Sequence, residues 1–172
     1  MGNIIGGRLI ASIIPVLCGI VGVFVSNLPF SFLGGWFPAP LYALMPIYFW
    51  CLVRPDLMSP GWAFVIGVLH DMLSGGPPGI WAASFVATYA LVDKQRDAFA
   101  GLSGWGALLG FATASLMCCA CGYLFYVFYR WQWLPISPYM KEFAATVLLY
   151  APVAVGLGAV HRKLVGPLRS DF

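Results

Sequence analysis

Charge is the scarcest property of this sequence. Only 9% of its 172 residues are Asp, Glu, Lys or Arg, whereas an average soluble domain carries about 25%. No charged residue occurs between Leu9 and Val53. So few charges cannot cover the surface of a water-soluble domain, which excludes that class, and the net charge of +3 gives no reason to expect nucleic acid as a partner.

The sequence also lacks a set of metal ligands. Its five cysteines include the stretch CCAC, in which Cys118 and Cys121 have CxxC spacing. A tetrahedral zinc site needs two further ligands, but there is no second cysteine pair, and His70 and His161 belong to other segments. We therefore predict that the cysteines are packing residues and that the chain holds no metal.

Catalytic arrangements are missing as well. Asp71 is the only acid deep in an apolar segment, and a membrane aspartyl protease needs two facing carboxylates. Ser74 is not part of a GxSG stretch, and the glycines of SGGPPG are followed by proline and not by the Lys of a phosphate-binding loop. The sequence predicts neither an enzyme nor a cofactor site.

Apolar residues are abundant, at 61% of the chain with a mean hydropathy of +0.87. A run of about 18 or more apolar residues is typical of a membrane-spanning helix. Pro, Gly and charged residues divide the chain into six apolar segments, several of them shorter than this, and together they predict one all-α multi-pass membrane domain over residues 1–172. The first apolar run is too long for a cleaved signal peptide, so we expect it to be retained. The expected spans are residues 9–28, 40–53, 61–73, 79–92, 102–129 and 143–160.

The basic residues predict the orientation of these spans. If the N-terminus is cytoplasmic, seven basic residues fall on the inner side and only Arg130 and Lys141 on the outer side. The inner seven are Arg8, Arg54, Lys94, Arg96, Arg162, Lys163 and Arg169. Basic residues favour the cytoplasmic side and tryptophans favour both interfaces. The basic residues therefore predict cytoplasmic termini. All seven tryptophans lie near expected span ends, which agrees with the same set of spans; they are Trp36, Trp50, Trp62, Trp81, Trp105, Trp131 and Trp133.

The fifth segment contains small residues at every fourth position. These five residues, called here the small-residue ladder, are Gly106, Gly110, Ala114, Cys118 and Gly122. Small residues on one helix face allow close approach of another helix in lipid. We expect a close helix contact at the ladder, with a partner helix in this chain or in another chain.

His70 and Asp71 are ionisable residues in an otherwise apolar segment. If the third span begins at the inner face near Gly61, Asp71 lies about 15 Å along the helix, near mid-membrane. A carboxylate there costs on the order of 3 kcal/mol, so such a residue is by default a candidate functional site. A polar contact between helices is an equally weighted alternative, and the two side chains need not share a helix face.

Three stretches resemble a known family. Gly67, Asp71, Ser74, Gly75 and Gly79 form a GxxxDxxSGxxxG pattern. The segment before it, LYALMPIYFWCLVRPD, ends in Arg54, Pro55 and Asp56. Together with the last span and its basic tail, LLYAPVAVGLGAVHRKL, these stretches are similar to the MreD family of the bacterial rod-shape (elongation) machinery.

The resemblance implies a non-enzymatic scaffold in the bacterial inner membrane that helps couple the cytoskeleton to peptidoglycan synthesis and so maintains cell shape. The partners it implies are MreC, the actin-like MreB, a RodA-type glycosyltransferase and a class B penicillin-binding transpeptidase. It also implies a fold similar to the six-helix substrate-binding subunits of energy-coupling-factor transporters.

The sequence also allows two other functions, and it allows two roles for one outer segment. A substrate-binding subunit of a vitamin-type transporter would need a cavity with convergent polar groups, and a membrane enzyme would need a titrating Asp71. The aromatic and proline-rich outer segment Tyr129–Glu142 suits either a landing surface for a periplasmic partner or a simple interfacial belt. Association of two copies of the chain also stays open.

Overall fold

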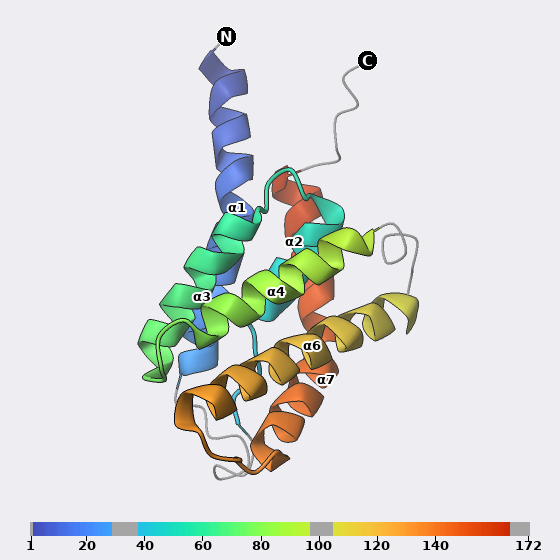
Figure 1. Cartoon of the computed structure of the whole chain (residues 1–172). Helices are drawn as coiled ribbons and strands as arrows, with labels where there is room; N and C mark the ends of the chain where they lie inside the picture. The colour runs from blue at the N-terminus through green and yellow to red at the C-terminus, as the bar shows by residue number, and fades with distance from the viewer. Residues whose placement is uncertain (1, 29–37, 97–104, 166–172) are drawn as a thin grey trace.

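The computed structural model describes residues 2–28, 38–96 and 105–165, which form a bundle of helices (Figure 1). Its α-helices are α1 (Gly2–Asn27), α2 (Leu44–Val53), α3 (Pro60–Ser74), α4 (Ile80–Lys94), α6 (Trp105–Arg130) and α7 (Ser137–Val160). Helix α7 continues into a short π-helix, η2 (His161–Val165). No strand occurs in these three described ranges, so the all-α prediction is confirmed for them.

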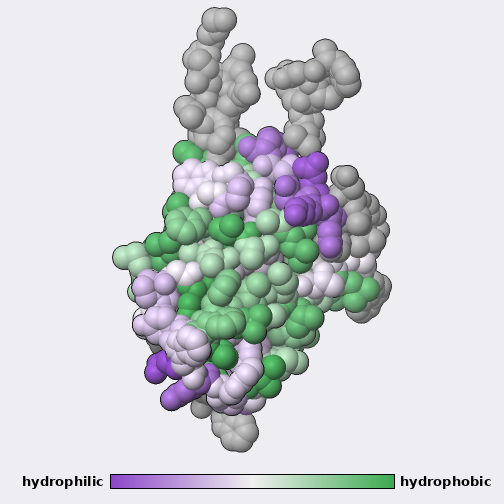
Figure 2. All heavy atoms as spheres, in the orientation of Figure 1, coloured by the Kyte–Doolittle hydropathy of each residue, from purple (hydrophilic) through white to green (hydrophobic). Residues whose placement is uncertain are grey.

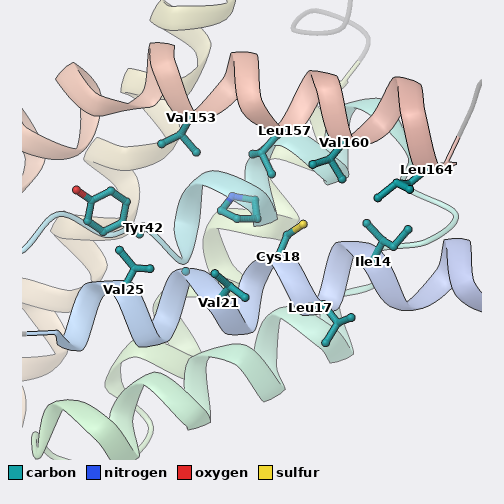
Figure 3. Close-up of a pocket in the computed structure, with 12 residues that line it drawn as sticks. Ile14, Leu17, Cys18, Val21, Val25, Tyr42, Val153, Leu157, Val160 and Leu164 are labelled. Atoms are coloured by element: carbon teal, nitrogen blue, oxygen red, sulfur yellow. The ribbon is translucent and has the colours of Figure 1, made fainter.

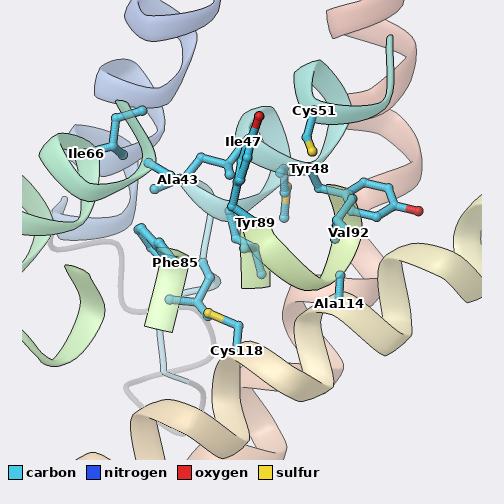
Figure 4. Packing of buried hydrophobic residues seen from close by; sticks show 14 of the residues in the cluster. Ala43, Ile47, Tyr48, Cys51, Ile66, Phe85, Tyr89, Val92, Ala114 and Cys118 are labelled. Carbon is cyan, nitrogen blue, oxygen red and sulfur yellow. The ribbon is translucent and has the colours of Figure 1, made fainter. Parts of the chain in front are cut away.

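Helix α2 lies at the centre of the bundle. It is apolar on every side, which is typical of a helix buried all round, and it packs against α1, α4, α6 and α7. Most of its residues are buried, namely Leu44, Met45, Pro46, Ile47, Tyr48, Trp50 and Cys51. Figure 4 shows Ile47 and Tyr48 of α2 close to Tyr89 and Val92 of α4.

Three aromatic rings join α2 to the last two helices. The ring centroid of Tyr48 lies 5.2 Å from that of Phe111 on α6 and 5.7 Å from that of Tyr150 on α7. Phe111 and Tyr150 stack with their centroids 3.8 Å apart. Such ring pairs stabilise a core beyond the area that they bury.

The helix ends gather at two opposite ends of the bundle. In Figure 1 the start of α1, the α2–α3 connection and η2 lie at the upper end. The turns between α3 and α4 and between α6 and α7 lie at the lower end. The chain therefore forms two hairpins, α3–α4 and α6–α7, whose turns point the same way.

The surface between these ends is apolar. Large side chains are strongly exposed on several helices, including Met72 at 76%, Leu148 at 78% and Val155 at 72%. Figure 2 shows a broad hydrophobic belt, with hydrophilic patches near the top and at the lower left. Two helical stretches, Gly106–Arg130 and Ser137–Val165, are long and apolar enough to cross a bilayer. This surface suits a membrane protein, because water would not tolerate so large an apolar area.

Several helix ends differ from the expected segments. Helix α1 begins before residue 9, α2 begins after residue 40, and α7 begins at Ser137. The expectation of an outer loop through Glu142 is therefore wrong, because Pro138 lies in the first turn of α7, where proline is tolerated. The helix ends are not bilayer boundaries, so the six spans and their limits stay predictions.

One tryptophan also differs from expectation. Trp50 is fully buried in the core and does not belong to an interfacial belt. Trp62, Trp131 and Trp133 are exposed, as an interfacial position requires. Trp36, Arg169 and most of the predicted turn after Leu28 lie outside the described residues.

Candidate functional site

Asp71 caps the N-terminus of the following helix. Its side chain lies near the end of α3 and is only 3% exposed. The carboxyl oxygens accept hydrogen bonds from the backbone N–H groups of Gly79 (2.9 Å), Trp81 (3.0 Å) and Ala82 (3.1 Å). The first N–H groups of a helix have no partner within it, and a carboxylate there also interacts favourably with the helix dipole. Asp71 therefore joins α3 to α4.

His70 makes different contacts from Asp71. Its Nδ1 lies 3.5 Å from Nδ2 of Asn27 at the end of α1. Its ring meets that of Trp81 edge-on, with centroids 5.4 Å apart, and also contacts Phe85. No hydrogen bond joins His70 to Asp71 within the described residues, so the arrangement suits a tie between α1, α3 and α4.

The glycines of the motif complete this hairpin. A Cβ atom on Gly67 would lie 2.4 Å from Cα of Ala82, so the backbones of α3 and α4 approach closely at this position. Gly75 ends α3 with φ of +66°, and Gly79 precedes α4 with φ of +96°. Residues with a Cβ avoid such angles. Glycine is thus required at Gly67 for space and at Gly75 and Gly79 for backbone conformation.

The structure brings all five residues of the GxxxDxxSGxxxG pattern into the α3–α4 hairpin. The fifth member, Ser74, donates a hydrogen bond from its hydroxyl to the carbonyl oxygen of Asp71 (3.3 Å). The residues of this pattern therefore stabilise the close packing of α3 against α4.

Arg54, Pro55 and Asp56 lie at the opposite end of the bundle, in the α2–α3 connection. The Arg54 guanidinium binds the Asp56 carboxylate in a bidentate pair, with Nε 2.9 Å from Oδ1 and Nη2 2.8 Å from Oδ2. This hydrogen-bonded guanidinium lowers the pKa of Asp56. The pair is fully formed at neutral pH and weakens as the pH falls through that lowered pKa. It closes the connection and is separate from the Asp71 contacts.

The small-residue ladder lies against α4 in the same chain. Gly110, Ala114, Cys118 and Gly122 are buried, and Gly106 is partly buried. Figure 4 places Ala114 and Cys118 on the side of α6 that faces α4. A Cβ on Gly122 would lie 3.4 Å from the Trp81 ring.

Two hydroxyl side chains that the sequence did not single out hold the chain before α2. Ser26 of α1 donates to the carbonyl oxygen of Pro40 (3.1 Å) and accepts from the N–H of Tyr42 (3.0 Å). Thr146 of α7 accepts from the N–H of Leu41 (3.0 Å). The only sequence signal for either residue is a lone hydroxyl in an apolar segment.

The five cysteines are free thiols, and Cys51, Cys118 and Cys119 are buried. Within the described ranges no three His, Cys, Asp or Glu side chains gather in a way that could hold a metal ion. The Cys118–Cys121 pair thus has no additional ligands there.

An apolar groove of about 490 Å³ lies between α1 and α7 (Figure 3). Val21 and Val25 line its α1 side, and Val153 and Leu157 line its α7 side. Its lining offers almost no polar surface. The groove can accommodate hydrocarbon but cannot orient a polar ligand.

A second pocket, of about 440 Å³, lies where the α3–α4 turn meets α6 and the start of α7. Its lining includes Glu142 and the rings of Trp81, Tyr126 and Tyr139. We call it the turn pocket. These residues belong to three different helices, with Trp81 in α4, Tyr126 in α6, and Tyr139 and Glu142 in α7. Only the packing of these helices brings them together.

The sequence matches one protein family. The family model described as rod shape-determining protein MreD matches residues 7–155. The chain is also similar to the rod shape-determining protein MreD of Haemophilus influenzae, at 26% identity over 66 residues. That match spans 38% of this chain and 41% of the relative. No solved structure matches the chain. Since the family model extends over most of the sequence, the chain belongs to the MreD family of rod shape-determining proteins.

Proposed function

We propose that this protein is a non-enzymatic scaffold of the bacterial elongation machinery, crossing the inner membrane six times with both termini in the cytoplasm. Its family membership implies a role in rod shape determination. The observation that carries the scaffold role is the use of Asp71, the acid of the GxxxDxxSGxxxG pattern, as an acceptor for three backbone N–H groups. That carboxyl group holds helices together and is not directed into an open site.

The distribution of the helix ends supports the proposed orientation. The α2–α3 connection with Arg54 and the π-helix η2 with Arg162 and Lys163 lie at one end of the bundle (Figure 1). The α6–α7 turn, flanked by Arg130 and Lys141, lies at the other. Basic residues favour the cytoplasmic side, so we assign the first end to the cytoplasm.

The partners follow from this orientation. The α2–α3, α3–α4 and α6–α7 connections are short, so we expect contacts with other proteins to use mainly helix faces and turns. We expect an MreC-type protein to bind directly, and the α6–α7 turn is available to its periplasmic part. A RodA-type glycosyltransferase and a class B transpeptidase would bind within the membrane, and MreB at the cytoplasmic end.

The vitamin-transporter alternative gains no support from the α1–α7 groove. A small-molecule site needs a few convergent polar groups, whereas this groove is lined almost entirely by apolar atoms. In a bilayer it would be filled by lipid or by a helix of another protein.

Purification of the tagged chain in mild detergent tests the scaffold role. We expect an MreC-type protein to co-purify with it, and an unrelated multi-pass protein with the same tag to recover none. We also expect depletion of the chain to round rod-shaped cells. Recovery of the chain alone, together with unaltered cell shape, would contradict the proposal.

A further inference from the structure

The turn pocket contains a carboxylate that no contact described above employs. Glu142 lies in the second turn of α7, and its side chain is mostly buried. Its backbone carbonyl accepts a hydrogen bond from Thr146 (2.6 Å). Among the described residues, no side chain or backbone donor forms a hydrogen bond with the Glu142 carboxyl group. Burial raises the pKa of the Glu142 carboxyl group to about 8, and a cation bound beside it would favour its charged form.

Aromatic rings surround this carboxyl group. Trp81 of α4, Tyr126 of α6 and Tyr139 of α7 line the same pocket. The Tyr139 ring is held edge-on against that of Tyr123, with centroids 5.3 Å apart. Aromatic faces attract cations, so the rings and the carboxyl group favour the same kind of ligand.

The protein's own Arg130 shows that one of these rings receives a guanidinium. The Arg130 guanidinium carbon lies 5.6 Å from the centroid of the Tyr126 ring, and its Nη2 donates to the Tyr126 hydroxyl (3.4 Å). Arg130 forms no ion pair with Glu142 in the part of the chain that the structure describes. The carboxyl group thus remains available to a second cation.

We propose that the turn pocket binds a cationic side chain, Arg or Lys, of a polypeptide on the outer side of the membrane. Glu142 binds its charged group, and Trp81 and Tyr139, which also line the pocket, contact its stem and its cationic face. The polypeptide source rests on the orientation in the proposed function, which exposes the α6–α7 turn to the periplasm. The affinity for a cation rests on the pocket alone.

This affinity is tested on the full chain in detergent by comparing a charged probe with an uncharged one, and the wild-type protein with variants at Glu142. The probes are N-acetylarginine amide and N-acetylcitrulline amide, which has the same shape but no charge. Binding is measured by saturation-transfer NMR titration. We expect the wild-type protein to bind the arginine probe at least about tenfold more tightly than the citrulline probe, which corresponds to about 1.4 kcal/mol.

The variant Glu142→Gln should abolish this preference, whereas Asp93→Asn, which removes an exposed carboxylate at the end of α4, should retain it. If Glu142→Gln does not fold, Glu142→Asp withdraws the charge from the pocket and should reduce the preference. Equal binding of the two probes to wild type, or an unchanged preference in the Glu142 variants, would overturn the proposal. That result would leave the scaffold role intact, since co-purification and cell shape test it separately.

Discussion

At the scale of single residues, Asp71 shows how an apolar helix tolerates a carboxyl group. The cost of such a group in the membrane interior is on the order of 3 kcal/mol. Three backbone N–H groups, of Gly79 and of the first turn of α4, offset this cost, and they would themselves lack partners without the carboxyl group. The carboxyl group and the N–H groups thus satisfy each other's hydrogen-bonding capacity where little water is present to do so.

Substitution of Asp71 should therefore weaken the fold in a graded way. We expect Asp71→Ala to insert but to lose about 2–4 kcal/mol of stability, because buried donors lose their acceptor. Asp71→Asn keeps a single acceptor oxygen, whereas Oδ2 accepts two N–H groups and Oδ1 accepts one. Its thermal midpoint in detergent should fall between those of wild type and Asp71→Ala.

The matched control is Asp93→Asn, which removes an exposed acid from the far end of α4, the helix that Asp71 caps, and should leave the midpoint unchanged. The amount of each variant in the membrane and its assembly with partners should follow the same order. Wild-type levels and normal complex formation for Asp71→Ala would contradict the capping role.

The sequence identified Asp71 as an exceptional residue but not its partners. The three donors are backbone N–H groups, which every residue except proline has, so the side-chain types in Gly79–Ala82 do not predict that these groups bind Asp71. Glu142 illustrates the same limit, because its position next to charged Lys141 resembled that of a residue in an outer loop. The turn pocket exists only after α4, α6 and α7 have packed.

At the scale of elements, the close approach of α3 and α4 depends on Gly67. Addition of a methyl group there would place a carbon against the backbone of α4, which cannot rotate away as a side chain can. The two helices would have to separate, and the Asp71 hydrogen bonds would lengthen as they did so.

We therefore expect Gly67→Ala to destabilise the protein by about 1–3 kcal/mol, the usual cost of overpacking. The matched control is Gly156→Ala in α7, where no atom lies within 4 Å of the added carbon. Alanine is the better helix former, so this control should be neutral or slightly stabilising. Thermal unfolding of both variants in the same detergent measures the difference, and equal midpoints would contradict the close contact.

Hydrophobic runs were sufficient to locate every described helix, but they did not give the helix ends. Residues 137–142 contain Pro138, Lys141 and Glu142, so their composition is typical of a loop. They form the first turns of α7 because proline is acceptable there and because the helix extends past the apolar region. The end of α3 was better marked, since Gly75 has the left-handed conformation that commonly ends a helix.

At the scale of the whole molecule, the bundle has an apolar belt between two ends that differ in charge. Exposed side chains such as Leu148 and Val155 are stable there only if lipid or another protein covers them. The composition predicted this environment, because so few charged residues leave no alternative. It could not predict that α2 is central and α1 peripheral, which depends on packing between segments far apart in the sequence.

The proposed orientation can be tested with single cysteines. In intact cells we expect a membrane-impermeant maleimide to label Trp133→Cys, which lies in the α6–α7 turn and is 86% exposed in the native residue. Lys94→Cys, at the end of α4, should react only after permeabilisation. Labelling of the wild-type protein measures the background from its five native cysteines. The opposite labelling pattern would place the termini outside and reverse the assignment.

The cap provided by Asp71 also constrains biosynthesis. During translation α3 emerges before α4, and a solitary α3 would bring its carboxyl group into lipid before any main-chain donor had arrived. Release of the two helices from the translocation channel as a pair avoids that intermediate. If α3 and α4 cross the membrane as proposed, Asp71 therefore favours entry of the two helices as one unit.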